Sequence, residues 1–219
     1  MPNWCFNGLT VEGNPASVKQ MMEQLNRPFE QMHDSWDIKT NTQEKKVTVY
    51  SNPVFAFHNI YSYIDHGVTQ DEYLAQPPRN KDQSFADWFK HETNDWYNFN
   101  QREWGVKWDV AVSDEDQYPD TTMEDEENGE NHVVYYKFNT PWSRPLPALE
   151  RLSKQYPTLL FTLSYEEETG WGGEMEILNG VTISESEYSN ICRQCDETDV
   201  LEYSVETGYE TCTQCGYEN

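Results

Sequence analysis

Four cysteines near the carboxy terminus constrain the fold of this chain more than any other feature. They form two Cys-x-x-Cys pairs, Cys192 with Cys195 and Cys212 with Cys215, separated by sixteen residues. This spacing is typical of sites in which each pair occupies a tight turn and four thiolates surround one zinc ion. We expect one structural zinc ion at a closed, non-catalytic site, with a redox-active or disulfide-bonded pair as the alternative.

The residues around the two pairs predict a zinc ribbon over residues 188–219. Residues 200–205 and 209–211 have the pattern of two short strands joined at a turn that contains Gly208. Gly216 follows the second pair, where a positive φ lets the chain turn back under a metal. The ribbon carries seven acidic residues against Arg193 alone. Because ribbons that contact nucleic acid do so with basic residues, we expect this one to stabilise the chain or to contact a protein.

The residues before the ribbon predict an α+β domain over residues 1–187. Alternation predicts a strand at 6–13, and Asn14-Pro15 followed by apolar residues at helical spacing predicts a helix at 15–26. Further strands are expected at 46–50, 104–112, 132–138, 158–165 and within 170–187, where Asn179-Gly180 is a hairpin signal, and a further helix begins at Leu146. With a helical insertion at about 52–103 and an acidic loop at about 113–131 set aside, the order is strand, helix, strand, strand, helix, strand. This order predicts a ferredoxin-like split βαβ sandwich.

Several stretches resemble a known family. The chain begins with the residues Pro2-Asn3-Trp4-Cys5-Phe6-Asn7-Gly8-Leu9-Thr10-Val11-Glu12-Gly13. This opening is similar to the start of small phage and plasmid proteins with a YubB-like ferredoxin-like domain. Three later stretches resemble the same family: Trp104 to Asp109, Thr140 to Ser143, and Glu166 to Gly173. The resemblance implies a phage or plasmid origin and a ferredoxin-like fold. It gives no enzymatic activity or catalytic residue to carry over, and we expect the carboxy-terminal ribbon to be an addition to that domain.

The charge of the chain is strongly negative and unevenly distributed. The formal net charge is −24, of which −5 falls in residues 1–110 and −19 in residues 111–219. This balance argues against nucleic-acid phosphates as partners and favours a basic protein surface. The densest acidic run has no calcium-loop register, which leaves a solvated loop or a DNA-mimicking surface. The candidate partner-binding residues are Asp114, Glu115, Asp116, Glu124, Asp125, Glu126, Glu127 and Glu130.

Other residue groups support weaker hypotheses. An alternative function is a nucleotide-binding or small-molecule-binding domain, or an enzyme, with an aromatic pocket. The candidates to line this pocket are Trp88, Trp96, Trp104 and Trp142. The tryptophan-rich strand at 104–112, with Arg102 and Lys107, is a candidate platform for single-stranded nucleic acid, although core packing explains it more simply. Glu166, Glu167, Glu168, Glu174 and Glu176 are read as exposed strand ends rather than as catalytic carboxylates.

These observations lead to one functional hypothesis. The number of cysteines is five, and an odd number favours a reducing compartment over a disulfide scaffold. The start shows no signal peptide, and no apolar run approaches the length that spans a membrane. We therefore expect a cytoplasmic protein, in the host cytoplasm if it is phage-encoded. We expect a phage accessory protein without enzymatic activity or catalytic residues, which binds a host protein through its acidic surface, with inhibition of that protein as the consequence of binding. Direct nucleic-acid binding and membrane association are not expected.

Overall fold

The computed structural model describes residues 2–37, 42–62, 96–115 and 120–189, and in the carboxy-terminal segment residues 192, 194–195, 197, 201–203 and 208–218. In chain order the elements are β1 (Trp4–Gly13), α1 (Pro15–Leu25), β2 (Phe29–Asp37), β3 (Thr42–Tyr50), α4 (Trp96–Glu103), β4 (Thr122–Glu127), β5 (His132–Pro141), α5 (Leu146–Gln155), β6 (Leu160–Glu167), β7 (Trp171–Leu178), β8 (Val181–Ser189), β9 (Leu201–Tyr203) and β10 (Glu210–Cys212).

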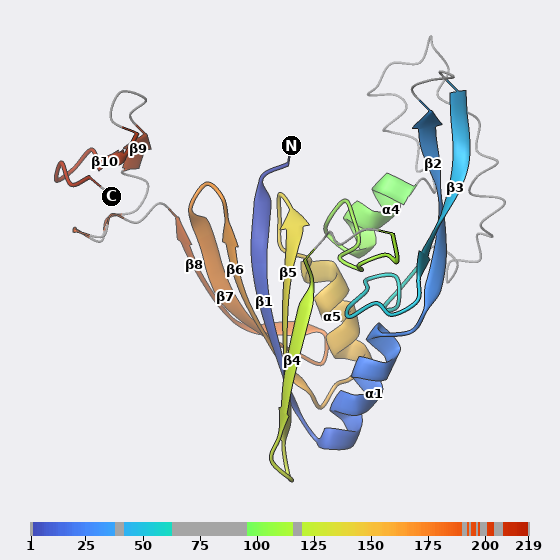
Figure 1. Cartoon of the computed structure of the whole chain (residues 1–219). Coiled ribbons are helices and arrows are strands. Elements are labelled where there is room, and N and C mark those ends of the chain that lie inside the picture. Colours follow the sequence, from blue (N-terminus) through green and yellow to red (C-terminus); the bar gives the residue numbers. More distant parts are fainter. Residues whose placement is uncertain are drawn as a thin grey trace.

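One antiparallel sheet of six strands forms the body of the protein. Its strand order is β4-β5-β1-β6-β7-β8, and the helices α1 and α5 cover one face (Figure 1). The elements β1, α1, β4, β5, α5 and β6 follow the ferredoxin-like order, and β7 and β8 extend the sheet beyond β6. The fold class is therefore the expected ferredoxin-like α+β arrangement.

Local sequence explains the elements that bound this sheet. The Asn14 side chain accepts a hydrogen bond from the Ala16 N–H at 3.0 Å and caps α1, whose Val18, Met21 and Leu25 are buried. Asn179 and Gly180 both have positive φ, at 51° and 75°, as a two-residue hairpin between β7 and β8 requires. The helix expected at 15–26 and the hairpin are both confirmed, and α5 confirms the helix expected from Leu146.

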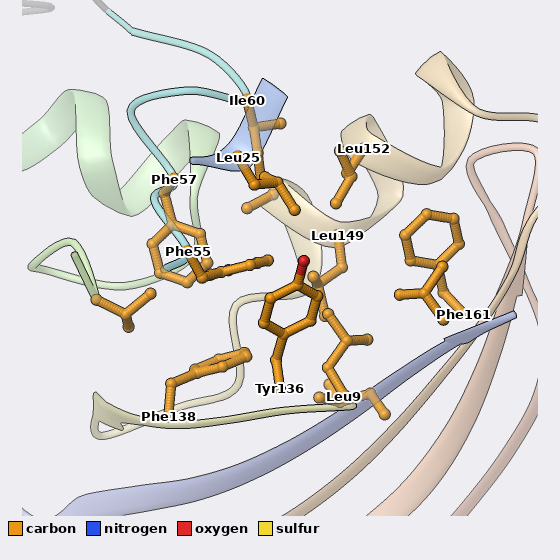
Figure 2. Packing of buried hydrophobic residues seen from close by; sticks show 14 of the residues in the cluster. Leu9, Leu25, Phe55, Phe57, Ile60, Tyr136, Phe138, Leu149, Leu152 and Phe161 are labelled. Carbon is orange, nitrogen blue, oxygen red and sulfur yellow. The ribbon is translucent and has the colours of Figure 1, made fainter. Parts of the chain in front are cut away.

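The hydrophobic core lies between the sheet and its helices. In β1, Cys5, Leu9 and Val11 are buried whereas Phe6 is exposed, so the alternation predicted for this strand is confirmed. Figure 2 shows side chains from the sheet meeting side chains from the helices and from the segment that follows β3. The labelled members of this core are Leu9, Leu25, Phe55, Phe57, Ile60, Tyr136, Phe138, Leu149, Leu152 and Phe161.

The region between α1 and β4 differs from the expectation. The strand expected at 46–50 is part of the longer β3. It pairs with β2 in a separate two-stranded hairpin, whose register runs from Phe29 opposite Tyr50 to Asp37 opposite Thr42. The addition to the ferredoxin-like order therefore begins directly after α1 and is not only helical. Within the expected helical insertion, α4 is the one described helix, and the expected helices before Trp96 lie outside the described residues.

The predicted strand at 104–112 is wrong. These residues are irregular, with Trp104, Val106 and Val110 buried but Trp108 exposed. Gly105 has a φ of 81°, which turns the backbone out of an extended path. The apolar alternation therefore reflects anchoring in the core and not pairing in a sheet.

The expected acidic loop at 113–131 is corrected in part. Thr122–Glu127 form β4, which pairs with β5 and supplies the second strand of the ferredoxin-like order. The connection between them is a short hairpin at residues 128–131, in which the Asn128 N–H donates to the Asn131 carbonyl at 3.0 Å.

One carboxylate fixes the irregular segment. Asp109 Oδ1 accepts from the N–H groups of Phe57 at 2.8 Å and Val110 at 2.7 Å, and Oδ2 accepts from that of His58 at 2.8 Å. Oδ1 also accepts from the Ala111 N–H at 3.2 Å. These bonds join the segment that carries Phe55 and Phe57 to the segment that carries Trp104 and Val110.

Replacing this carboxylate should destabilise the domain. Asp109→Ala leaves four N–H groups without their acceptor, and we expect the free energy of unfolding to fall by about 3 kcal/mol. Asp109→Asn keeps one oxygen for the three donors at Oδ1, so its free energy of unfolding should fall by about half as much as that of Asp109→Ala. Urea denaturation measures both changes. Equal stability of Asp109→Ala and the parent protein would contradict the proposed role.

Candidate functional sites: a cysteine cluster and an acidic sheet face

The four paired cysteines come together as the sequence predicts. The Sγ atoms of Cys192, Cys195, Cys212 and Cys215 all lie within 4.8 Å of one another. The sulfur of Cys192 is 3.6 Å from that of Cys215, and the sulfur of Cys195 is 3.6 Å from that of Cys212. Tetrahedral coordination at a Zn–S distance of about 2.3 Å gives sulfur–sulfur distances of about 3.8 Å. The cluster therefore has the dimensions of a four-thiolate site that could hold one metal ion.

Local backbone geometry positions these sulfurs. The Gln194 N–H donates to Cys192 Sγ and the Cys215 N–H donates to Cys212 Sγ, each at 3.4 Å. Gly216 has a φ of 70°, and its N–H donates to the Cys212 carbonyl at 2.8 Å, which closes the second turn. Between the two pairs, β9 and β10 form the expected hairpin. The cysteines are thiols without disulfide bonds, so the disulfide alternative does not describe this structure.

Cys5 is chemically separate from this cluster. Its side chain is buried in β1, and burial raises the pKa of its thiol to about 11. A thiol in this environment stays protonated at neutral pH and is a poor nucleophile.

The described acidic residues that were predicted as one surface do not share one face of the protein. Glu124 and Glu126 alternate with Asp125 and Glu127 along β4, so the two pairs point to opposite faces of the sheet. Asp125 Oδ2 lies 2.8 Å from His132 Nε2, and Glu127 forms a 2.6 Å ion pair with Lys19 that lowers the pKa of its carboxyl group.

The remaining predicted acidic residues lie away from the sheet face or outside the described chain. Asp114 accepts hydrogen bonds from the Ser51 hydroxyl at 2.6 Å and the Ser51 N–H at 2.9 Å, which lower the pKa of its carboxyl group. Glu115 pairs with Lys46 at 2.6 Å, and Glu130 is exposed in the β4–β5 hairpin. Asp116 lies outside the described residues.

The face of the sheet opposite the helices is more acidic than the sequence analysis anticipated. Residues directly opposite each other on neighbouring strands point to the same side of a sheet. One row of such partners runs across five strands, in the order Glu124, Tyr135, Thr10, Thr162 and Glu176. We call this side the open face. In the described residues of its six strands, the charged side chains on it are Glu12, Glu124, Glu126, Glu166, Glu174, Glu176 and Lys137.

Sequence reasoning missed four of these carboxylates as members of one surface. Glu166 and Glu174 are exposed as expected, but Glu176 is half-buried and Glu167 is buried on the other face, where it accepts a hydrogen bond from the Thr169 N–H at 2.7 Å. The two-residue alternation along each strand could have shown which glutamates share a face within that strand. Only the pairing of the strands shows that these glutamates share a face with Glu124 and Glu126.

Exposed aromatic rings accompany the carboxylates on the open face. Phe6 lies between Asn139 and Glu166 on the neighbouring strands, and Tyr188 lies opposite Gly172. A Cβ at Gly172 would lie 2.5 Å from the Tyr188 hydroxyl, so the tyrosine ring lies over β7. Burial, together with the nearby Glu166 carboxylate, raises the pKa of Tyr188.

Of the tryptophan residues proposed for a pocket, the two with described side chains, Trp104 and Trp142, lie in different surroundings. Trp104 is buried in the core, where its Nε1–H donates to the Tyr61 carbonyl at 2.8 Å. Trp142 is 44% exposed and stacks with Trp108 at a ring separation of 6.1 Å. Trp88 lies outside the described residues, and of Trp96 only its place at the start of α4 is described.

The cations proposed beside a nucleic-acid platform are already engaged. Arg102 Nε lies 2.8 Å from Glu103 Oε1. Lys107 Nζ lies 4.5 Å from the centre of the Trp108 ring and 5.6 Å from that of Trp142. Neither lies on an aromatic sheet strand, because residues 104–112 form no strand.

The comparison with protein-family models agrees with the ferredoxin-like fold. Residues 107–204 match a family model described as a ferredoxin-like domain in Api92-like protein. The crystal structure of the protein api92 from Yersinia pseudotuberculosis is similar, with a TM-score of 0.46 and 10% sequence identity, covering 86% of this chain and 99% of that chain. No curated protein matches the sequence. No helix in the described part of the chain is long and apolar enough to span a membrane.

Proposed function

We propose that this protein is a non-enzymatic binding protein that uses its open sheet face to hold a partner protein with a basic surface. The charge of that face supports this proposal, because the face carries six glutamates and one lysine. Carboxylates at this density attract a basic surface over a range of about 8–10 Å at physiological salt and disfavour phosphates.

The family resemblance gives this proposal its biological setting. Small phage and plasmid proteins with a YubB-like domain provide the resemblance, so the partner would be a host protein in the host cytoplasm. A nucleic-acid-processing or defence factor has the basic surface that such a face would occupy. Binding would then inhibit the host factor by covering its nucleic-acid site.

The metal at the cysteine cluster is zinc in this proposal. Four thiolates in a closed tetrahedral shell favour zinc, and the ion would supply the folding energy that a hairpin with three-residue strands lacks. The ribbon would extend the acidic surface and take no part in chemistry.

Binding to the host partner should depend on salt and on the face that a charge occupies. Once affinity purification identifies the partner, we expect the affinity to fall steeply between about 50 and about 500 mM salt. Glu124→Lys, on the open face, should weaken binding about tenfold. Glu127→Lys makes the same charge change three residues along the same strand but on the opposite face, and should have less than about a twofold effect. Affinity that does not change with salt would rule out the proposal.

The metal assignment makes a separate prediction. Elemental analysis should find about one zinc per chain. A thiol reagent added to the native protein should find the four cluster cysteines only after a chelator removes the ion, and Cys5 only after denaturation. Clearly less than one zinc per chain, or four reactive thiols before chelation, would refute the assignment.

A further inference from the structure

A depression in the open face has the lining of a site for a cationic side chain. Its volume is about 690 Å³, and its lining includes Phe6, Gly8, Lys137, Glu166, Glu174 and Tyr188. Asp120 also borders it, so three carboxylates stand against one lysine. A ligand that enters this depression meets negative charge together with exposed aromatic surface.

Two rings flank one carboxylate in this depression. Phe6 on β1 is directly opposite Glu166 on β6, and Glu166 is directly opposite Gly172 on β7. Tyr188 lies over Gly172 from the other side. Glu166 therefore lies between a phenylalanine that is 48% exposed and a tyrosine that is 38% exposed. Neighbouring strands are about 4.8 Å apart, so a single planar group can touch a ring and the carboxylate together.

Glycine at two positions keeps the depression open. Gly8 lies between Lys137 and Ser164, and a Cβ there would lie 2.8 Å from the Ser164 hydroxyl. A side chain at Gly172 would meet the Tyr188 hydroxyl and displace the ring from β7. Larger residues at either position would fill the floor or move a wall.

We propose that this depression binds an arginine side chain from a basic segment of the partner protein. A guanidinium group is planar, stacks on aromatic faces and donates paired hydrogen bonds to a carboxylate, which matches Phe6, Tyr188 and Glu166. Glu174, which lies opposite Ser164 on β6, adds a second negative charge. The inference rests on the proposed function, since it names the chemistry by which the acidic face recognises its partner.

Single-stranded nucleic acid is the competing occupant. Exposed rings on a ferredoxin-like sheet can stack bases, as RNA-binding domains with this fold do. The backbone phosphates would then approach Asp120, Glu166 and Glu174 with only Lys137 to compensate. The charge of the lining therefore favours the guanidinium group.

Chemical-shift mapping by nuclear magnetic resonance tests the proposal directly. The full chain is titrated at low salt with a hexa-arginine peptide, with a hexa-glutamate peptide and with a single-stranded RNA oligonucleotide. We expect hexa-arginine alone to bind, with the largest shifts at Phe6, Gly8, Gly172 and Tyr188. RNA binding to these residues would overturn the proposal.

Matched variants separate the depression from the general acidity of the face. Glu166→Gln and Phe6→Leu should each weaken hexa-arginine binding about fivefold, because each removes one partner of the guanidinium group. Phe6→Tyr keeps a ring and should bind normally, and Glu126→Gln, on the same face at the far end of β4, should change affinity less than about twofold. The three substituted positions lie in strands of the sheet, and the dispersion of the amide resonances checks that each variant keeps its fold.

Two outcomes distinguish a failure of the arginine site from a failure of the proposed function. If Glu166→Gln and Glu126→Gln weaken binding equally, the acidic face attracts cations without a specific site, and only the arginine proposal fails. If hexa-arginine produces no shifts on the open face at low salt, the proposed function fails with it.

Discussion

The pairing of β1 with β5 on one side and β6 on the other is the interaction on which the rest of the structure depends. It buries Leu9 and Val11 against the helices and by the same alternation turns Phe6 and Gly8 outward. A shift of one residue in this register would exchange the two faces. The hydrophobic core and the composition of the open face are therefore set by one constraint.

The acidic strand β4 can exist because its neighbour orders it. Thr122–Glu127 contain four acidic residues, a composition with little intrinsic preference for a strand. β5 carries buried Val134, Tyr136 and Phe138 on one side and offers a free edge to β4. The charges that this edge strand carries also discourage pairing with another chain, since like charges on exposed edges oppose aggregation. Acidity therefore serves both the edge and the face.

Local signals in the sequence predicted what depends on local physics. The Asn14-Pro15 start of α1, the Asn179-Gly180 turn and the cysteine cluster each follow from a few neighbouring residues, and each is found. The strand at 104–112 was wrong because Trp104, Val106 and Val110 are buried by contacts with distant segments, and Asp109 takes the N–H groups that a sheet would have used. The open face could not be predicted, because Glu124 and Glu166 are brought together only by the order of the strands.

Residue-resolved hydrogen exchange of β4 tests the central claim most directly, because the acidic face exists only if this segment is paired with β5. The structure predicts that alternate amides between Thr122 and Glu127 exchange on the order of 100-fold more slowly than in an unstructured chain, while their neighbours exchange faster. Exchange at unstructured rates throughout this segment would show a solvated loop, and would remove Glu124 and Glu126 from the open face.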